Sequence, residues 1–399
     1  MGKKLQPKLR FRGFTDAWEP RRLKSLHRQP LLVSPVPSQT YISWSVPAFS
    51  TGEPEIVKGS EIESVKQSVN SSDVLLCRIN PRINRVWVVE ARKDTDLPML
   101  ASTEWVVFTG HNSDSYFLSA LFTSSRFRNM LLSEVAGVTG SQKRFQIASV
   151  LERQEYFPTQ IEQARIGLLF AKVDNLIAAE KRKLLLLEQK REAYSQKVFS
   201  YGSHHGEDAK HWKMMRLGDI ATRITRRNKG RSNLPLTISA RDGLIDQRHF
   251  FSKQVASKNL DNYILLQRGE FAYNKSTSSD SPWGTIKRLD RYDQGCVSTL
   301  YICFSTHSVD SQFITTLFNS PIWHREIQAI ATEGARNHGL LNISSKDFFD
   351  IQLQIPDSLS EQKHIGRFFA AYEQLIRQTA KRIGLLEKKK KALLQTMFI

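Results

Sequence analysis

The sequence has little of what marks secreted, membrane-spanning or zinc-binding proteins. Only three of its 399 residues are cysteines, Cys77, Cys296 and Cys303, and none forms a CxxC pair. This spacing excludes a disulfide framework and predicts free thiols in a reducing compartment. No run of 18 apolar residues occurs, and the first residues lack the apolar core of a signal peptide. We therefore expect a cytoplasmic protein that does not contact a membrane.

Sequence motifs for enzymatic chemistry are missing as well. An adenine methyltransferase needs an Asn-Pro-Pro-aromatic loop, but Arg82 follows Asn80-Pro81, and Ser320 follows Asn319. No G-x-x-x-x-G-K-[ST] phosphate-binding loop occurs, so we do not expect this chain to hydrolyse ATP. These absences argue against a self-sufficient adenine methyltransferase or ATPase.

Two groups of residues resemble metal sites only superficially. Asp357 precedes Glu361 and Lys363, as in many endonucleases, but Glu361 lies at the start of an expected helix. There Ser360 would cap the helix, and the acid would favour its positive end. Three histidines near mid-chain have no cysteine or carboxylate cluster to complete a tetrahedral set, so a solvated linker is the better interpretation. They are His204, His205 and His211. We expect neither a bound metal nor a cofactor in this chain.

Acidic residues are in short supply. The chain has 58 Lys and Arg against 39 Asp and Glu, a formal net charge of +19 at pH 7. A surplus of this size attracts polyanions, of which nucleic acid is the commonest. A basic protein without such a partner is the plainer alternative. The hydrophobic content of 40% is sufficient for packed cores, and the length allows two to three domains.

The chain repeats itself. Residues 162–199 align without a gap with residues 361–398, at an offset of 361 − 162 = 199, and 15 of the 38 pairs are identical. Neither copy contains proline, and apolar residues recur at steps of three and four, which predicts two long helices. Each would be about 57 Å long at ~1.5 Å per residue, so we expect the two to pair. Two unrelated amphipathic helices would not explain the ungapped match.

The repeated apolar positions define the predicted contact between the helices. They form a coiled-coil seam, interrupted at the matching places Glu180/Thr379 and Arg191/Lys390, and we expect antiparallel pairing. The seam residues are Ile166, Leu169, Val173, Leu176, Leu184, Leu187, Tyr194 and Val198 in the first copy, and Ile365, Phe368, Tyr372, Leu375, Ile383, Leu386, Leu393 and Met397 in the second.

The segments before the two helices resemble each other more weakly. Trp18 corresponds to Trp212, and Leu23 to Leu217. Residues 86–89 and 296–304 are predicted strands, and residues 117–132 and 312–330 are predicted helices. We expect an α+β fold with an internal pseudo-twofold repeat. Its parts are a mixed domain over 1–157, a spacer helix over 158–200, a linker over 201–210, a second mixed domain over 211–356 and a second spacer helix over 357–399.

This symmetry points to DNA. A duplicated chain with two antiparallel helices has approximate twofold symmetry, and so does the backbone of double-stranded DNA. Dimeric DNA readers place two heads a fixed distance apart for this reason. Here one chain would supply both heads, and because the heads differ in sequence the two half-sites should differ.

The opening segment and the helix ends carry a family resemblance. The chain opens with Pro7-Lys8-Leu9-Arg10-Phe11 and Phe14-Thr15-Asp16-Ala17-Trp18-Glu19. Both repeats start with Glu-Gln-x-x-Ile-Gly and end with Gln-x-x-Phe. In these features the chain resembles type I restriction-modification specificity subunits over nearly its whole length, and the helix repeats are the specific part of the likeness.

The resemblance implies a noncatalytic DNA-specificity subunit. Its two target-recognition domains would each read one half of a bipartite asymmetric DNA site, and its paired helices would set the spacing and dock two methyltransferase subunits. Two motor-nuclease subunits would complete a complex that is an adenine-specific DNA methyltransferase and an ATP-dependent endonuclease. S-adenosylmethionine, ATP and Mg²⁺ would be used by those partner subunits.

Candidate DNA contacts are clusters of Arg, Lys and Asn. Arg78, Asn80, Arg82 and Asn84 alternate along a segment broken by Pro81, which places four donors on one side of a loop or edge strand. Arginine suits guanine edges and asparagine suits adenine edges. The candidates are Arg78, Asn80, Arg82, Asn84, Arg85, Lys143 and Arg144 in the first domain, and Arg223, Arg226, Arg227, Lys229, Arg231, Asn274, Lys275, Lys287, Arg288, Arg336 and Asn337 in the second.

Each cluster also has a plainer interpretation. Residues 78–85 are equally well explained as a solvated strand face. The acid-free run 222–231 suits phosphate contact better than base reading, and a solvated turn is the alternative. The loops 137–144 and 334–339 occupy matching places, which slightly favours a functional role. A self-sufficient nuclease or methyltransferase, and a coiled-coil adaptor that binds only protein, are the competing hypotheses for the whole chain.

Overall fold

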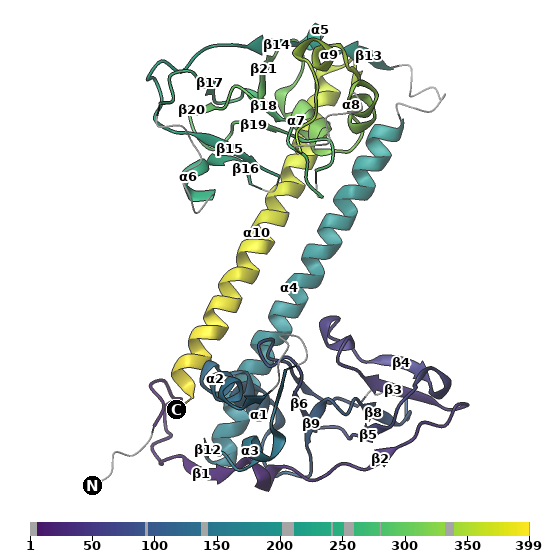
Figure 1. Ribbon diagram of the computed structural model, residues 1–399, viewed down its shortest axis with the longest axis vertical. Helices are drawn as coiled ribbons and strands as arrows, with labels where there is room; N and C mark the ends of the chain where they lie inside the picture. The colour runs from purple at the N-terminus through teal and green to yellow at the C-terminus, as the bar shows by residue number, and fades with distance from the viewer. Residues whose placement is uncertain are drawn as a thin grey trace. The chain divides into compact units, whose positions relative to one another are not determined.

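The computed structural model describes residues 6–91, 95–136, 143–201, 211–240, 242–250, 259–279, 281–331 and 339–398. The chain divides into two compact units, Met1–Arg182 with Ala380–Ile399, and Lys183–Thr379. Each unit holds one α/β head and part of each of two long helices, α4 (Gln160–Tyr201) and α10 (Leu359–Met397) (Figure 1). Residues 19–157 are termed the first head, and residues 212–356 the second head.

Within its described residues, the first head combines two main sheets with three α-helices and three short 3-10 helices, Leu23–Leu26, Ala48–Ser50 and Gly59–Glu61. Its strands are β1 (Glu19–Arg22), β2 (Leu32–Val33), β3 (Thr40–Trp44), β4 (Glu55–Lys58), β5 (Lys66–Ser68), β6 (Val74–Cys77), β7 (Val86–Val88), β8 (Met99–Ala101), β9 (Trp105–Phe108), β10 (Val135–Ala136), β11 (Arg144–Phe145) and β12 (Gln154–Phe157). A five-stranded sheet has the order β2-β5-β8-β3-β4, and a three-stranded sheet has the order β7-β6-β9. The pair β1-β12 is antiparallel and joins the start of the head to the strand that leads into α4.

The helices of the first head are α1 (Ser115–Thr123), α2 (Ser125–Ser133) and α3 (Ile147–Leu151). The helical character predicted over 117–132 is confirmed, but it is divided between two helices. The helix is broken at Ser124, whose hydroxyl accepts a hydrogen bond from the Phe127 amide at 3.2 Å and caps α2. A serine that bonds a nearby backbone amide favours a helix start over a helix interior.

The second head has the same kind of architecture. Its strands are β13 (Trp212–Arg216), β14 (Ala221–Ile224), β15 (Leu236–Ser239), β16 (Gly243–Asp246), β17 (Ile264–Gln267), β18 (Phe271–Asn274), β19 (Thr285–Arg288), β20 (Gln294–Val297), β21 (Ile302–Thr306) and β22 (Gln352–Pro356). Its helices are α5 (Leu217–Ile220), α6 (Gln247–Phe250), α7 (Ser311–Asn319), α8 (His324–Ile330) and α9 (Ser345–Asp350). The main sheet has the order β14-β21-β18-β19, and β13-β22 matches β1-β12.

Two predicted elements of the second head are split in the structure. The strand expected over 296–304 becomes β20 and β21, because a turn closes between them with the Tyr301 amide bonded to the Ser298 carbonyl at 3.1 Å. The helix expected over 312–330 becomes α7 and α8. Pro321 lies between them, where it cannot donate a helical hydrogen bond.

Each head buries its core against the start of one long helix and the end of the other. In the first unit, Phe170 of α4 and Met397 and Phe398 at the end of α10 belong to one apolar core. In the second unit, Phe199 of α4 belongs to the core, and Ile365 of α10 packs on it. Burying a large apolar side chain contributes roughly 1.5–3 kcal/mol. A helix start beside a helix end in both units makes the pair antiparallel, which confirms the predicted fold class.

Equivalent hydroxyl residues just before the two repeats start the long helices in the same way. The Thr159 hydroxyl accepts from the Glu162 amide at 3.4 Å, and the Ser358 hydroxyl accepts from the Glu361 amide at 3.3 Å. Ser358 therefore caps α10, and the prediction that Ser360 would do so is wrong. The reason is that α10 begins at Leu359, two residues before the repeated Glu361-Gln362 pair.

Gln163 and Gln362 fasten each long helix to its own head. Both side chains are buried, and each donates to the carbonyl of the proline that precedes its helix, at 2.9 and 2.8 Å. Each also accepts from a backbone amide, Gln163 from Asp114 at 3.2 Å and Gln362 from Asp310 at 2.7 Å. Those two aspartates cap α1 and α7. The repeat is thus a junction between helix and head as well as a seam.

One of the two polar interruptions of the seam, Arg191/Lys390, forms an ion pair in each unit. Arg191 pairs with Glu373 at 3.0 Å in the second unit, and Lys390 pairs with Asp174 at 2.5 Å in the first. These pairs are related by the repeat, since 191 + 199 = 390 and 174 + 199 = 373. Their duplication fixes the same helix register in both units.

The predicted seam residues differ in burial. Ile166 and Ile383 are buried, whereas Leu176, Tyr194, Phe368 and Leu375 are exposed. The neighbours Ile177 and Phe369 are buried instead. A straight helix drifts by about 20° per heptad from a strict repeat of 3.5 residues per turn, so an adjacent apolar residue takes the buried place. The remaining members are half-buried: Leu169, Val173, Leu184, Leu187, Val198, Ile365, Tyr372, Leu386 and Leu393; Met397 is buried.

Candidate nucleic-acid interface

In the first head, two predicted clusters lie side by side. The loop between β6 and β7 pairs with β11: the Asn80 amide donates to the Lys143 carbonyl at 2.7 Å, and the Phe145 amide donates to the Arg78 carbonyl at 3.3 Å. Ile79 forms a β-bridge with Arg144. Residues 78–85 and 143–144, which are far apart in the sequence, therefore form one surface.

The second head repeats this pairing at the matching place. The Thr277 amide donates to the Gly339 carbonyl at 2.7 Å, and the Leu341 amide donates to the Lys275 carbonyl at 3.0 Å. Ser276 forms the corresponding β-bridge with Leu340. The loop after the central strand of each head is thus held by the same short segment, so the internal repeat extends to the candidate interface.

Four of the seven candidates in the first head are used to hold the loop. Arg144 makes an ion pair with Glu104 at 2.8 Å, and Arg78 approaches the same carboxylate at 3.7 Å. Asn84 donates to the Phe122 carbonyl at 2.8 Å. The fourth, Arg85, donates to a backbone carbonyl within the loop at 3.4 Å. These side chains position the loop, and their donors are partly occupied.

The other three candidates line a hollow in the described part of the first head. Within the described residues, the side chains of Asn80, Arg82 and Lys143 have no hydrogen-bond or ion-pair partner. They line a hollow of about 360 Å³ together with three apolar residues, Pro81, Leu132 and Val135. A hollow of this size lies in the range of sites that bind small molecules or parts of larger ones.

In the second head, the cations come from the loop between β14 and β15. Asn228 is fully buried, donates to the Ser232 carbonyl at 2.8 Å and accepts from the Ser232 amide at 2.9 Å. The turn continues through Lys229 and Gly230, which both have positive φ. Asn and Gly tolerate such turns, so Asn-Lys-Gly is a turn signal that the charge pattern obscured. The buried amide holds Arg227, Lys229 and Arg231 on the surface, all exposed.

Arg227 and Arg231 also donate to backbone carbonyls, and most of the remaining candidates of the second head have internal partners. Arg226 pairs with Glu270 at 2.7 Å, Lys275 donates to the Ile343 carbonyl at 3.1 Å, and Arg288 pairs with Asp290 at 2.6 Å. The Asn274 side chain accepts from a backbone amide at 3.1 Å. Arg223 is exposed on β14. Arg336 and Asn337 lie outside the described residues, as do His204, His205 and most of the predicted linker.

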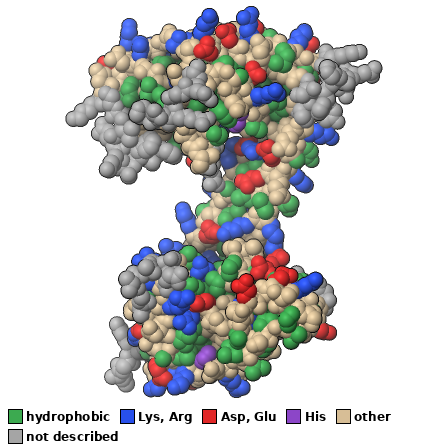
Figure 2. Space-filling view, turned by 45° about the vertical axis from the view of Figure 1, so that its right-hand side comes forward, with side chains coloured by type: hydrophobic (Ala, Val, Ile, Leu, Met, Phe, Trp, Pro, Cys, Tyr) green, Lys and Arg blue, Asp and Glu red, His purple; other side chains and the backbone are tan. Residues whose placement is uncertain are grey.

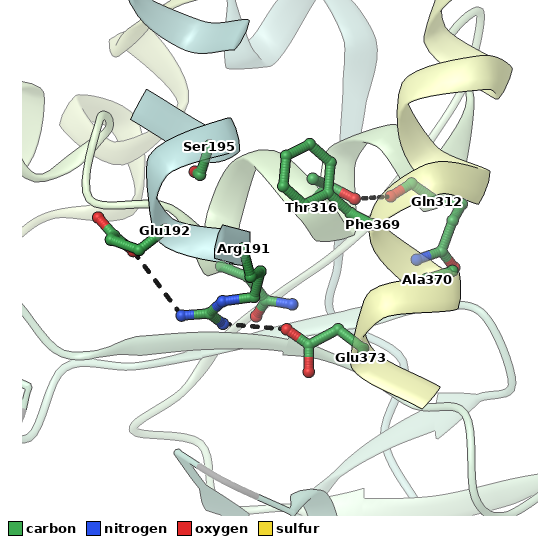
Figure 3. Close-up of a pocket in the computed structure, with 9 residues that line it drawn as sticks. Arg191, Glu192, Ser195, Gln312, Thr316, Phe369, Ala370 and Glu373 are labelled. Carbon is green, nitrogen blue, oxygen red and sulfur yellow. Dashed lines mark hydrogen bonds and ion pairs between the residues drawn. The ribbon is translucent and has the colours of Figure 1, made fainter. Parts of the chain in front are cut away.

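Lys287 belongs to a polar junction between the second head and the helix pair. Its ammonium donates to the Asn319 side chain at 2.6 Å. Burial lowers the pKa of Lys287, while Glu373 raises it and Arg191 lowers it further. The last two form the ion pair drawn in Figure 3, beside a cavity of about 20 Å³ that also borders Gln312. That volume holds one water molecule, which excludes a substrate or cofactor there.

The described residues contain neither a metal-binding cluster nor a helix suited to a bilayer. No group of three or more His, Cys, Asp or Glu side chains in this part of the chain could hold a metal ion. None of its helices combines the length and the apolar character needed to cross a membrane.

On the face drawn in Figure 2, Lys and Arg side chains gather on one side of the first head, the lower head in that view, and Asp and Glu gather on another.

The arrangement of two similar heads on an antiparallel helix pair has counterparts among solved structures. The type I restriction-modification S subunit from M. genitalium is 14% identical in sequence, with a TM-score of 0.63 over 99% of this chain and 99% of that chain. The chain has the fold of a type I specificity subunit. No family model and no curated protein matches the sequence.

Two further structures align over nearly the full length. A chain from a structure that describes complex assembly and conformational transition of the type I R-M system is 16% identical in sequence. Its TM-score is 0.49 over 96% of this chain and 97% of that chain. The HsdS subunit from Thermoanaerobacter tengcongensis is 17% identical, with a TM-score of 0.42 over 96% of each chain. The specificity-subunit fold itself rests on the M. genitalium structure.

Proposed function

We propose that this chain is the noncatalytic DNA-specificity subunit of a type I restriction-modification complex. The duplicated architecture carries the proposal: two heads of one design, each with a paired loop beyond its central strand, stand on an antiparallel helix pair. Each head reads one half of a bipartite asymmetric site. The net charge of +19 supplies the attraction to the DNA backbone.

The two heads contact DNA with different loops. In the first head, the open donors Asn80, Arg82 and Lys143 face the duplex. In the second head, the rigid turn around Asn228 presents exposed cations that contact phosphates, because a cluster of basic side chains without acids neutralises backbone charge and carries little sequence information. We assign Lys287 and Arg288 to the structural frame, because both are engaged with residues of α7.

The outer faces of the long helices dock two methyltransferase subunits. Leu176 and Leu375, and likewise Leu186 and Leu385, are related by the repeat and are all exposed. Matched exposed leucines on both helices provide two equivalent apolar docking surfaces. With those partners the complex methylates adenine using S-adenosylmethionine. Two motor-nuclease subunits add restriction that depends on ATP and Mg²⁺.

The helix pair sets the distance between the two half-sites. Removing residues 176–182 and 375–381 together deletes one heptad from each matching position. We expect the gap in the recognised site to shorten by about three base pairs, since seven residues span about 10 Å at ~1.5 Å each and a base pair rises about 3.4 Å. Mapping methyladenine in cells that express the variant with its methyltransferase partner checks this. An unchanged gap would contradict the ruler role.

Binding experiments separate this function from its competitors. The purified chain in complex with its methyltransferase subunits should bind one sequence class in a library of duplexes. The chain alone should neither cleave DNA with Mg²⁺ nor methylate it with S-adenosylmethionine. Activity of the isolated chain would identify an enzyme, and binding without sequence preference would identify an adaptor.

A further inference from the structure

We infer that the hollow of the first head reads an A·T base pair in the major groove, with the Asn80 amide on the adenine edge and Leu132 and Val135 against the thymine methyl group. This inference rests on the proposed function and deepens it, because it assigns one base pair to one side chain. The juxtaposition that carries it is an open amide beside an apolar wall in a hollow of about 360 Å³.

The backbone of Asn80 is fixed while its side chain stays open. Its amide donates to the Lys143 carbonyl at 2.7 Å, and its carbonyl accepts from the Ile83 amide at 2.9 Å. Its φ of +49° is a left-handed conformation that asparagine tolerates better than most residues. A residue held at both backbone groups presents its amide in one place, which is what a base-reading contact requires.

The lining of the hollow matches the chemistry of one base pair. Adenine presents an acceptor at N7 and a donor at N6, and a side-chain amide satisfies both at once. Thymine presents a methyl group on the same edge of the pair, and apolar side chains contact it. Leu132 and Val135 supply that apolar surface. A G·C pair offers two acceptors on guanine and no methyl group, so it fits this lining less well.

The two cations of the hollow complete the contact. Arg82 and Lys143 flank Asn80 and have no partner within the described residues. Both reach outward as phosphate donors on either side of the base pair that is read. They therefore add affinity that does not depend on sequence, and Asn80 adds the discrimination.

The matching loop of the second head provides a built-in control. Thr277 stands at the place of Asn80, and Gly339 stands at the place of Lys143, as the paired hydrogen bonds of both heads show. Neither residue offers an amide or a cation. Because Thr277 belongs to the other head, a substitution there should leave base discrimination in the first half-site unchanged.

Asn80→Gly and Asn80→Asp test the inference in the complex with the methyltransferase partner. Glycine accepts positive φ and removes only the amide, so the loop keeps its shape. Sequencing of methyladenine should show that Asn80→Gly relaxes one position of one half-site, from A·T to any pair, with about a 5- to 150-fold loss of discrimination. Asn80→Asp should shift that position toward cytosine, whose N4 amino group donates to a carboxylate.

The outcomes separate this inference from the proposed function. A relaxed A·T position with the second half-site unchanged supports the inference, and Arg82→Ala should weaken binding without relaxing any position. An Asn80→Gly complex that keeps the full motif overturns the inference and leaves the specificity role standing. A wild-type complex that shows no motif overturns the proposed function itself.

Discussion

The two heads are built to one plan but expose their donors from different loops. Both use a capping aspartate, a buried glutamine and a helix glycine to join the head to its long helix. In the first head, open donors surround the loop after β6, whereas in the second head exposed cations, two of them bonded to backbone carbonyls, stand on the turn around Asn228. The junctions must match because they hold the same helices. The loops are free to differ, and that difference allows two unlike half-sites.

The heads also differ in how firmly their helix starts are tied down. The fully buried Glu162 carboxylate accepts two hydrogen bonds from Arg10, both at 2.7 Å. These contacts raise the pKa of the Arg10 guanidinium. The equivalent Glu361 accepts one hydrogen bond from the Trp212 indole at 3.0 Å and is half-buried. The equivalent glutamates therefore stabilise the two helix starts to different degrees.

The largest expected effect comes from replacing the glutamate at each helix start. Glu162→Gln leaves the Arg10 charge without its counter-ion and should lower the opening free energy of the first head by about 3 kcal/mol. Glu361→Gln should cost the second head about 1 kcal/mol, because it weakens one hydrogen bond. Hydrogen exchange of core amides in each head measures both values. Equal losses would contradict the unequal anchoring.

Alanine substitutions at the helix glycines should show a smaller difference between the heads, again with the larger loss of stability in the first head. A Cβ at Gly167 would lie 2.0 Å from the Asp114 carboxylate and 2.8 Å from the Phe117 amide. A Cβ at Gly366 would lie 2.8 Å from the Phe313 amide. Overpacking costs typically about 1–3 kcal/mol, so Gly167→Ala should lie at the upper end of that range and Gly366→Ala lower. Gly384→Ala on α10 is the control, because an added Cβ there would meet no atom within 4 Å. A loss of stability in that variant would contradict the overpacking explanation.

The basic turn of the second head should act on affinity alone. Lys229→Ala and Arg227→Ala should each reduce the magnitude of the negative slope of log K against log salt by about 0.9 and leave the recognised motif unchanged. The exposed Arg325 on α8 is the matched control. Titrations of the complex at several salt concentrations measure the slope. A changed motif would show that this turn reads bases.

The smallest effect is a pH dependence of the first head that comes from His111. Burial lowers the pKa of His111, while Asp73 and Asp114 oppose that shift. The folded state therefore holds the neutral ring, and the unfolded state binds more protons below the ordinary value of about 6.5. The stability of the first head should fall as the pH drops below that value. His111→Asn should remove this part of the loss, and hydrogen exchange of the first head's core amides above and below that pH measures it.

The sequence predicted the repeated features and missed the ones that depend on distant partners. The ungapped repeat was sufficient to predict two paired helices, because apolar periodicity and cap residues are local signals. Which donors stay open was not predictable: Arg78 and Arg144 look as available as Arg82 until Glu104 is brought beside them. The structural role of Asn228 was hidden in the same way, since its buried place depends on the turn that surrounds it.

The most direct test of the central claim exchanges one head. Residues 211–356 would be replaced by the second head of another type I specificity subunit, and methyladenine would be mapped in cells that express the hybrid with its methyltransferase partner. Our account predicts that one half of the bipartite motif changes, while the other half and the gap stay as they were. A motif that changes in both halves, or in neither, would contradict the claim that each head reads its own half-site.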